Sequence, residues 1–216
     1  GAQFSELSYQ IGGFDAYTTS NVLKGSGLSS SAAFEVLVGT ILSHLYNDAT
    51  VSAVQIAQIA QYAENVFFGK PCGLMDQMAS SVGSFVAIDF ADPKHPVIKK
   101  VEFDFASCDY SLCIVDTHGN HADLTDDYAS IPKEMKSVAA LFGKEVLRGI
   151  TIDELIEKAP IIRGKCSDRA FLRAIHFTQD NERAQQLAAA LEQNDFETFK
   201  RIIVESGHSS FMYLQN

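Results

Sequence analysis

Lys24-Gly-Ser-Gly-Leu-Ser-Ser-Ser-Ala-Ala33 places two glycines and four serines where an extended segment gives way to a helical pattern. Gly25 and Gly27 allow the backbone to take positive φ angles and to approach a ligand closely. The serines 29–31 can cap the next helix, whose free N–H groups and positive dipole end would then face an anion. The segment predicts a phosphate-binding loop, although by itself it also allows a simple helix cap after a glycine turn. It matches neither a Walker A loop nor the Gly-x-Gly-x-x-Gly fingerprint.

Hydrophobic periodicity on either side of this loop predicts a mixture of strands and helices. Residues 14–22 alternate and are rich in β-branched and aromatic side chains, which is typical of a strand that runs into the loop. Helical spacing follows over 30–45 and over 52–67, with Ser52 as the N-cap of the second helix. The later segments predict a helix at 73–82, strands at 84–90, 97–103 and 110–116, and helices at 130–142, 153–158, 166–191 and 195–209.

Composition argues against several classes of protein. The 216 residues include 17 Lys+Arg against 27 Asp+Glu, and the formal charge of −10 disfavours a nucleic-acid-binding surface. The chain contains no apolar run long enough to span a bilayer and no recognisable signal peptide, so we expect a soluble, cytoplasmic protein with no membrane partner. The four cysteines lack zinc-ligand spacing and predict reduced thiols, of which Cys72 is expected to be a packing residue rather than a nucleophile.

Three motifs carry a resemblance to a known family. Gly27-Leu-Ser-Ser-Ser-Ala-Ala33 resembles the second signature of the GHMP small-molecule kinases, in which such a loop holds the ATP phosphates. Glu64-Asn-Val-Phe-Phe-Gly-Lys-Pro-Cys-Gly-Leu-Met-Asp-Gln77 resembles the catalytic stretch of the galactokinase family within that superfamily, and Thr117–Tyr128 resembles its sugar-binding loop. The order and separation of these motifs favour the galactokinase family, and the resemblance covers most of the chain.

The resemblance implies an α/β (α+β) protein with the two-layer GHMP kinase fold, in which helices pack on a largely antiparallel sheet. The first half would resemble domain 2 of ribosomal protein S5, and the helix-rich second half would be ferredoxin-like. Residues 1–105 are expected to form part of the N-terminal, ATP-binding domain, and residues 106–216 part of the C-terminal domain.

The same resemblance assigns the catalytic role to Asp76, which would orient the sugar hydroxyl or accept its proton. Gly73 would let the backbone approach the sugar, and Tyr128 would hydrogen-bond to the sugar or stack on it. Read from the residues alone, Asp76 is also a candidate helix N-cap, and a loop tyrosine is more often a packing residue.

ATP and Mg²⁺ are the implied cosubstrate and cofactor. Ser31 and Glu64 would bind the cation, since Mg²⁺ prefers hard oxygen ligands, whereas a lone helical glutamate is usually solvated. The residues expected around the phosphates are Gly25, Gly27, Leu28, Ser29, Ser30 and Ser31.

Two other polar clusters are expected to be structural. His118 and His121, with several nearby aspartates, lack a defined third ligand on a helix and predict a polar turn rather than a metal loop. A set of basic residues is expected on one solvated helical face, with an anion contact as the alternative: Arg163, Lys165, Arg169 and Arg173.

The implied activity is phosphorylation of galactose at its C1 hydroxyl by ATP, in a protein expected to be a monomer with small-molecule partners. Two alternatives stay open: a non-catalytic galactose- and ATP-binding regulator on the same fold, and a kinase of a related sugar such as N-acetylgalactosamine. The intact serine motif favours catalysis. The family's Glu-His-Thr-Asp signature with its arginine, and its C-terminal glycine-rich signature, do not occur in the sequence. We therefore expect an excised segment that is inactive alone.

Overall fold

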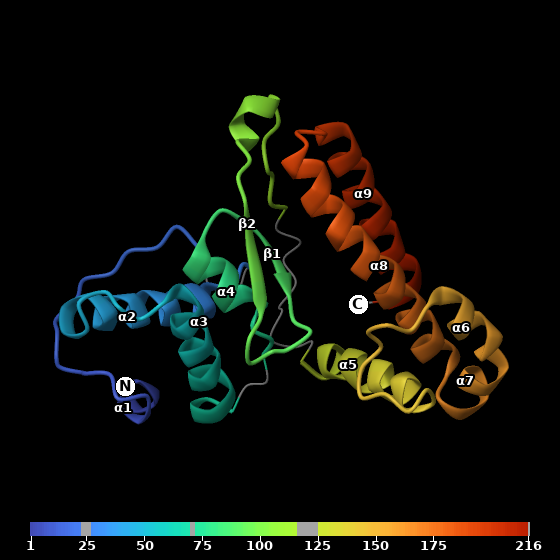
Figure 1. Cartoon of the computed structure of the whole chain (residues 1–216), viewed down its shortest axis with the longest axis horizontal. Helices are drawn as coiled ribbons and strands as arrows, with labels where there is room; N and C mark the ends of the chain where they lie inside the picture. The colour runs from blue at the N-terminus through green and yellow to red at the C-terminus, as the bar shows by residue number, and fades with distance from the viewer. Residues whose placement is uncertain (23–26, 70–71, 116–124, 216) are drawn as a thin grey trace. The chain divides into compact units, whose positions relative to one another are not determined.

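The computed structural model describes residues 1–22, 27–69, 72–115 and 125–215, and the chain divides into two compact units (Figure 1). Unit 1 comprises Gly1–Lys100 and Val115–His121, and unit 2 comprises Val101–Ile114 and Ala122–Asn216. Each unit has a hydrophobic core of its own. The predicted division after residue 105 lies near the boundary between Lys100 and Val101.

The first elements of the chain are helices followed by a β-hairpin. They are α1 (Ala2–Glu6), α2 (Ser30–Tyr46), α3 (Ala53–Tyr62), the π-helical η1 (Ala63–Phe67), α4 (Met75–Val82), β1 (Phe85–Asp89) and β2 (Val97–Val101). The two strands pair with each other, and their short connection makes the pair antiparallel. These elements confirm the helices and strands predicted between residues 30 and 103.

Two apolar clusters hold unit 1 together. In the first, Phe4 of α1 packs with Val36 of α2 and Ile56 of α3. In the second, Met78 of α4, which is fully buried, packs with Ala57 of α3 and is covered by side chains of the hairpin. The Ser52 cap of α3 is confirmed, because its hydroxyl accepts from the Gln55 N–H while the Gln55 side chain accepts from the Ser52 N–H.

The strand predicted over residues 14–22 is wrong, since these residues form no regular element. A strand needs a neighbouring strand for its N–H and C=O groups, and an alternating pattern reports only a local preference. Side chains at the end of α2 hold residues that come just before this stretch. The Asn47 side chain bonds the N–H and the carbonyl of Gln10 at 2.8 and 2.9 Å, and the Tyr46 hydroxyl donates to the Gly13 carbonyl.

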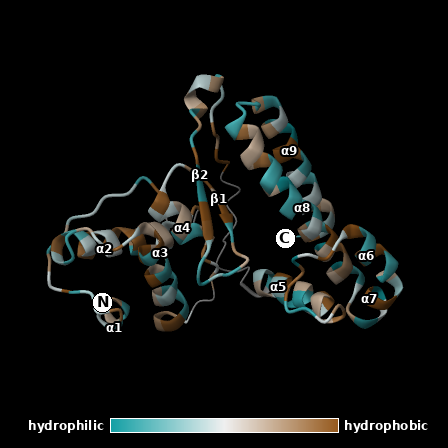
Figure 2. Cartoon of the chain, in the orientation of Figure 1, coloured by the Kyte–Doolittle hydropathy of each residue, from teal (hydrophilic) through white to brown (hydrophobic). Residues whose placement is uncertain are grey.

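Unit 2 is helical beyond the end of β2 in the residues that the structure describes. Its elements are the 3₁₀ turn η2 (Phe105–Cys108), α5 (Thr125–Ala140), α6 (Ile152–Glu157), α7 (Ala159–Lys165), α8 (Asp168–Glu192), α9 (Phe196–Ser209) and the π-helical η4 (Ser210–Leu214). The long helices α8 and α9 lie side by side (Figure 1). Both carry hydrophobic and hydrophilic residues along their length (Figure 2), and α8 supplies Ala170 and Ala174 to a core with Val138 and Leu155.

The strand predicted over residues 110–116 is wrong for 110–115, and residue 116 lies outside the described part of the chain. An aromatic cluster explains the difference. The ring of Tyr110 lies 5.1 Å from that of Phe196 at the start of α9, and Lys200 donates to the Tyr110 hydroxyl at 2.6 Å. Phe103 also stacks on Phe196, at 5.9 Å between ring centroids. Tyr110, the first residue of the segment, is therefore held by side chains rather than by a sheet.

The prediction of one solvated basic face is also wrong. Arg163 lies on α7 and Arg169 on α8, so the residues do not share a helix. Arg163 pairs in solvent with Asp168, at 2.6 Å, whereas Arg173 is 2% exposed. Helical periodicity places residues on a face but does not identify what covers that face.

Within the described ranges, no helix combines the length and apolarity that crossing a bilayer would need.

Candidate active site

The predicted phosphate-binding loop, called the serine loop from here on, leads into α2 through Ser29, whose backbone is strained. Gly27 has a φ of +73°, as expected of glycine in such a turn, and Ser29, the N-cap residue, has a φ of +57° and a ψ of +40°. A left-handed conformation costs a serine about 1–2 kcal/mol. Ser29 does not cap the helix through its side chain, which corrects the expectation for this residue. Strain of this kind is typical of ligand-binding loops.

The Ser29 hydroxyl instead donates to Oδ2 of Asp76 at 2.7 Å. Asp76 lies in the first turn of α4 and is exposed, and the N-cap of that helix is Leu74. The alternative that Asp76 is a helix cap is therefore wrong. The contact brings the predicted catalytic carboxylate to the predicted phosphate loop, across 47 residues of sequence.

Ser31 and Glu64 meet at the beginning of α2. The Ser31 hydroxyl donates to Oε1 of Glu64 at 3.1 Å, and Glu64 is only 4% exposed. Glu64 lies in the π-helical turn η1 at the end of α3, and such turns are frequent at functional sites. Glu64 is therefore buried, unlike most helical glutamates, which are solvated.

Gln77 is a member of this cluster that the sequence analysis did not single out. Its Nε2 donates to Oε2 of Glu64 at 3.0 Å, and the side chain is 1% exposed. Ser31 and Gln77 therefore hold one carboxylate oxygen each. The sequence offered one signal for Gln77, its position directly after Asp76 in the quoted motif. Consecutive helical residues point to different sides, so the residue after an exposed Asp76 can face the interior.

Cys72 lies beside Glu64 and is a poor nucleophile. Burial raises the pKa of the Cys72 thiol to about 11, and the negative charge of Glu64 acts in the same direction. The backbone of Cys72 is fixed by Asn65, which accepts from its N–H at 2.6 Å and donates to its carbonyl at 3.3 Å. These contacts attach the start of the catalytic motif to η1 and confirm the expected structural role.

The remaining predicted residues differ in where they lie. Leu28 is 42% exposed, and Gly25 lies outside the described residues. Gly73 is exposed, and a Cβ added to it would meet nothing within 4 Å among the residues that the structure describes. Tyr128 belongs to unit 2, in the first turn of α5, and is 43% exposed. The histidines of the predicted polar turn also lie outside the described residues.

A cavity of about 590 Å³ opens beside Ser31 and Glu64. Apart from these two residues and Glu35, its wall is mostly apolar and comes from α1, α2, α3 and the region of η1. Its volume falls in the range of small-molecule sites.

Ser31 and Glu64 fit a magnesium ion that is bound together with a nucleotide. Both offer hard oxygen atoms at one point, and Mg²⁺ is usually held by one or two carboxylates plus substrate phosphates rather than by a cage of protein ligands. The part of the chain that the structure describes holds no group of three or more His, Cys, Asp or Glu side chains suited to a metal.

Comparison with known proteins gives this cluster its context. Residues 2–84 match the GHMP kinases N terminal domain. The chain is 35% identical to galactokinase of Bos taurus over 199 residues, which are 91% of this chain and 48% of that protein. It is 31% identical to galactokinase of Streptomyces coelicolor over 205 residues, which are 95% of this chain and 52% of that protein.

The fold agrees with these similarities. The crystal structure of Lactococcus lactis galactokinase complexed with galactose matches 99% of this chain and 55% of that chain, with a TM-score of 0.70 and 18% identity. The predicted GHMP kinase fold and the predicted resemblance to galactokinases are therefore confirmed. The chain spans about half the length of the curated relatives it matches.

Proposed function

We propose that the whole protein is a galactokinase, which transfers the γ-phosphoryl group of ATP to the C1 hydroxyl of galactose and releases ADP and galactose 1-phosphate. One observation carries the proposal: Ser29–Asp76 and Ser31–Glu64 join the serine loop to the second motif through two separate hydrogen bonds. Relatives named galactokinase, at 31 to 35% identity over more than nine-tenths of the chain, support it.

Asp76 acts on the acceptor hydroxyl. Phosphoryl transfer requires little covalent chemistry from the protein, so an aspartate at the acceptor mainly orients the hydroxyl and takes its proton. The carboxylate is exposed, and its hydrogen bond from Ser29 fixes one oxygen beside the phosphate loop. The other oxygen is then directed to the sugar.

The start of α2 binds the phosphates. Its first N–H groups are not capped by Ser29, and the positive end of the helix dipole favours an anion there. The loop residues in this role are Gly25, Gly27, Leu28, Ser29, Ser30 and Ser31.

Ser31 and Glu64 hold Mg²⁺, and Gln77 keeps the Glu64 carboxylate turned toward Ser31. When bound, the cation neutralises charge on the phosphates. Gly73 and Tyr128 contribute to the sugar site. Residues 1–105 and 106–216 serve as parts of the N-terminal and C-terminal kinase domains.

The protein works as a cytoplasmic monomer in this proposal. Its described cysteines are all free thiols, which suits a reducing compartment.

The test is a coupled ADP-release assay of the whole protein with Mg-ATP and, in turn, galactose, N-acetylgalactosamine and no sugar. We expect galactose-dependent release. ADP release only with N-acetylgalactosamine would show that this sugar, rather than galactose, is the substrate. Binding of galactose and ATP without turnover would indicate a non-catalytic regulator.

A further inference from the structure

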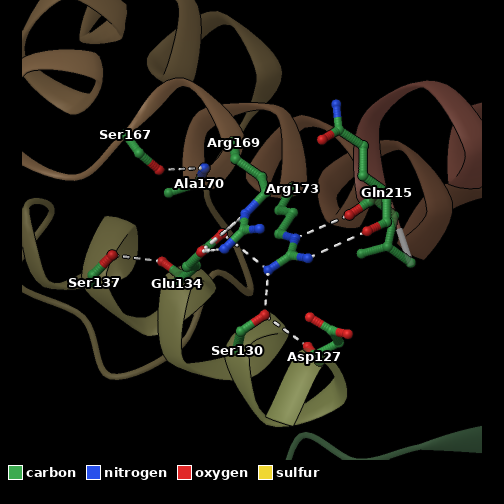
Figure 3. A network of polar contacts seen from close by, with 10 residues as sticks. Asp127, Ser130, Glu134, Ser137, Ser167, Arg169, Ala170, Arg173 and Gln215 are labelled. Carbon is green, nitrogen blue, oxygen red and sulfur yellow. Dashed lines mark hydrogen bonds and ion pairs between the residues drawn. The ribbon is translucent and has the colours of Figure 1, made fainter. Parts of the chain in front are cut away.

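The buried guanidinium of Arg173 links three elements of unit 2 (Figure 3). From α8, its Nη1 donates to Ser130 Oγ at 2.9 Å and to Glu134 Oε2 at 3.0 Å, both on α5. Its Nε donates to the carbonyl of Leu214 at 2.9 Å, and Nη2 donates to that of Gln215 at 3.4 Å. The guanidinium is thus surrounded by oxygen acceptors at the end of η4 and on α5.

The charges of this network match. Arginine cannot discharge itself by losing a proton, so a buried guanidinium needs a counter-ion and acceptors. Glu134 supplies the counter-ion. Burial alone would raise the pKa of Glu134, but the hydrogen bond from Arg169 and the charges of Arg173 and Arg169 outweigh burial and lower it. The carboxylate therefore stays ionised, and the position of α5 against α8 is fixed.

Ser130 connects the Arg173 guanidinium to the backbone next to Tyr128. Its hydroxyl accepts from Arg173 and donates to the carbonyl of Asp127 at 2.6 Å (Figure 3). That carbonyl belongs to the peptide bond that joins Asp127 to Tyr128. Two hydrogen bonds in series polarise each other, which strengthens both.

The helix itself holds this turn less well than usual. Pro132 lies inside α5 and has no N–H to donate to the carbonyl four residues earlier, which is that of Tyr128. The helical ladder therefore supplies one hydrogen bond fewer in the turn that carries Tyr128. The side-chain relay acts on the same turn without depending on that ladder.

We propose that Arg173 is a positioning residue for the sugar site, which acts through Ser130 and the Asp127 carbonyl to fix the turn of α5 that presents Tyr128. The expected effect of Arg173 on sugar binding rests on the proposed function. Arg173 itself does not touch the substrate in this proposal, and its effect belongs to sugar binding rather than to ATP binding.

The test uses Ser130→Ala in the whole protein, with Ser137→Ala as the matched control. Ser137 lies on the same helix and makes the same local bond, from its hydroxyl to the carbonyl three residues earlier, at 2.6 Å, and its hydroxyl is exposed. Both variants lose an equivalent local bond, but only Ser130→Ala cuts the relay from Arg173.

Two readouts are compared. The first is the ¹⁹F NMR signal of 3-fluorotyrosine placed at position 128, which reports the surroundings of that side chain whether or not the protein phosphorylates galactose. The second is steady-state kinetics, where loss of one hydrogen bond of about 0.5–1.5 kcal/mol raises the KM for galactose ~2- to 10-fold and leaves the KM for ATP unchanged.

We expect Ser130→Ala to shift or broaden the ¹⁹F signal and to raise the galactose KM, and Ser137→Ala to do neither. Arg173→Lys, which keeps the charge but not the planar fork, should behave like Ser130→Ala. An unchanged ¹⁹F signal in Ser130→Ala, or equal effects in both serine variants, would overturn the inference. A wild-type protein that does not phosphorylate galactose would overturn the proposed function instead, and the ¹⁹F comparison would still decide whether the relay holds Tyr128.

Discussion

Unit 1 buries a carboxylate, Glu64, whereas unit 2 buries a guanidinium, Arg173. The hydrogen bonds described for Glu64 come from two neutral side chains, Ser31 and Gln77. Arg173 faces a carboxylate, a hydroxyl and two carbonyls. The two buried groups differ in their setting, because Glu64 lines a cavity whereas Arg173 joins α8 to α5 and to the end of η4.

This difference separates a binding site from a scaffold. The Glu64 cluster adjoins exposed groups on the serine loop and α4 and a cavity of about 590 Å³, so small ligands can reach it. The Arg173 network is completed by groups of the protein itself. A buried charged group on the wall of a small-molecule cavity is a candidate for function, whereas one enclosed by helices of its own unit is typical of structure.

The largest expected effect comes from Asp76→Asn in the whole protein. Loss of the base or orienting group should lower kcat by ~10²–10⁴-fold with little change in the KM for ATP. The control is Asp153→Asn, since Asp153 is also exposed in the first turn of a helix, α6 in unit 2. Coupled ADP release measures both. A similar kcat in the two variants would remove Asp76 from the mechanism.

Arg173→Met should destabilise the protein strongly, because the Ser130 hydroxyl and the carbonyls of Leu214 and Gln215 would lose their buried donor, and Glu134 would keep only its pair with Arg169. Breaking a buried ion pair costs about 3–5 kcal/mol of unfolding free energy. The comparison is Arg163→Met, whose pair with Asp168 is in solvent and should matter little. Urea unfolding followed by circular dichroism checks this. Equal losses of unfolding free energy in the two variants would show that the buried Arg173 matters no more for stability than the exposed Arg163.

Alkylation of Cys72 tests the electrostatics beside Glu64. A pKa of about 11 instead of 9.0 lowers the thiolate fraction, partly offset by higher intrinsic nucleophilicity. The net rate should be ~10-fold slower than for an ordinary thiol. Iodoacetamide labelling at mildly alkaline pH, read by peptide mass spectrometry, compares Cys72 with exposed Cys113. Faster labelling of Cys72 would contradict the described surroundings of Glu64.

The smallest effect concerns His176, whose Nδ1 lies 2.9 Å from Ser209 Oγ. Burial lowers the pKa of His176 below its ordinary 6.5, with Asp180 opposing and Arg183 assisting. The unfolded chain therefore binds the proton more readily, so stability is present above pH 6.5 and is lost as the pH falls from there toward the lower pKa. Urea midpoints across this window should fall less in His176→Gln than in wild type. Parallel curves would exclude His176 as the cause.

The sequence predicted well what depends on neighbouring residues. The α2 and α3 helices, the Ser52 cap and the β1–β2 hairpin follow from local periodicity and capping chemistry. The strands expected at 14–22 and 110–115 did not form because a strand depends on a distant partner. The Asn47 side chain bonds Gln10 just before the first segment, and Phe196 packs on Tyr110 at the start of the second.

The site was predicted in its members but not in its contacts. The motifs identified Ser31, Glu64 and Asp76, but no spacing rule reveals that Ser29 adopts a left-handed conformation and bonds Asp76. For the same reason, Gln77 was not singled out and Arg173 was assigned to a solvated face. A buried polar side chain is recognised by what surrounds it, and the surroundings of both come from other helices.

Calorimetric titration of Glu64→Gln in the whole protein addresses the contrast between the two buried charges most directly. Glu35→Gln, which alters another carboxylate of the same cavity wall, is the control. The Glu64 variant should bind Mg-ATP about tenfold or more weakly, since a charge-assisted contact contributes ~1.5–3 kcal/mol, and should bind galactose as wild type does. A folded Glu64→Gln protein that binds Mg-ATP unchanged, or that loses both ligands equally, would contradict a metal-nucleotide site at Glu64.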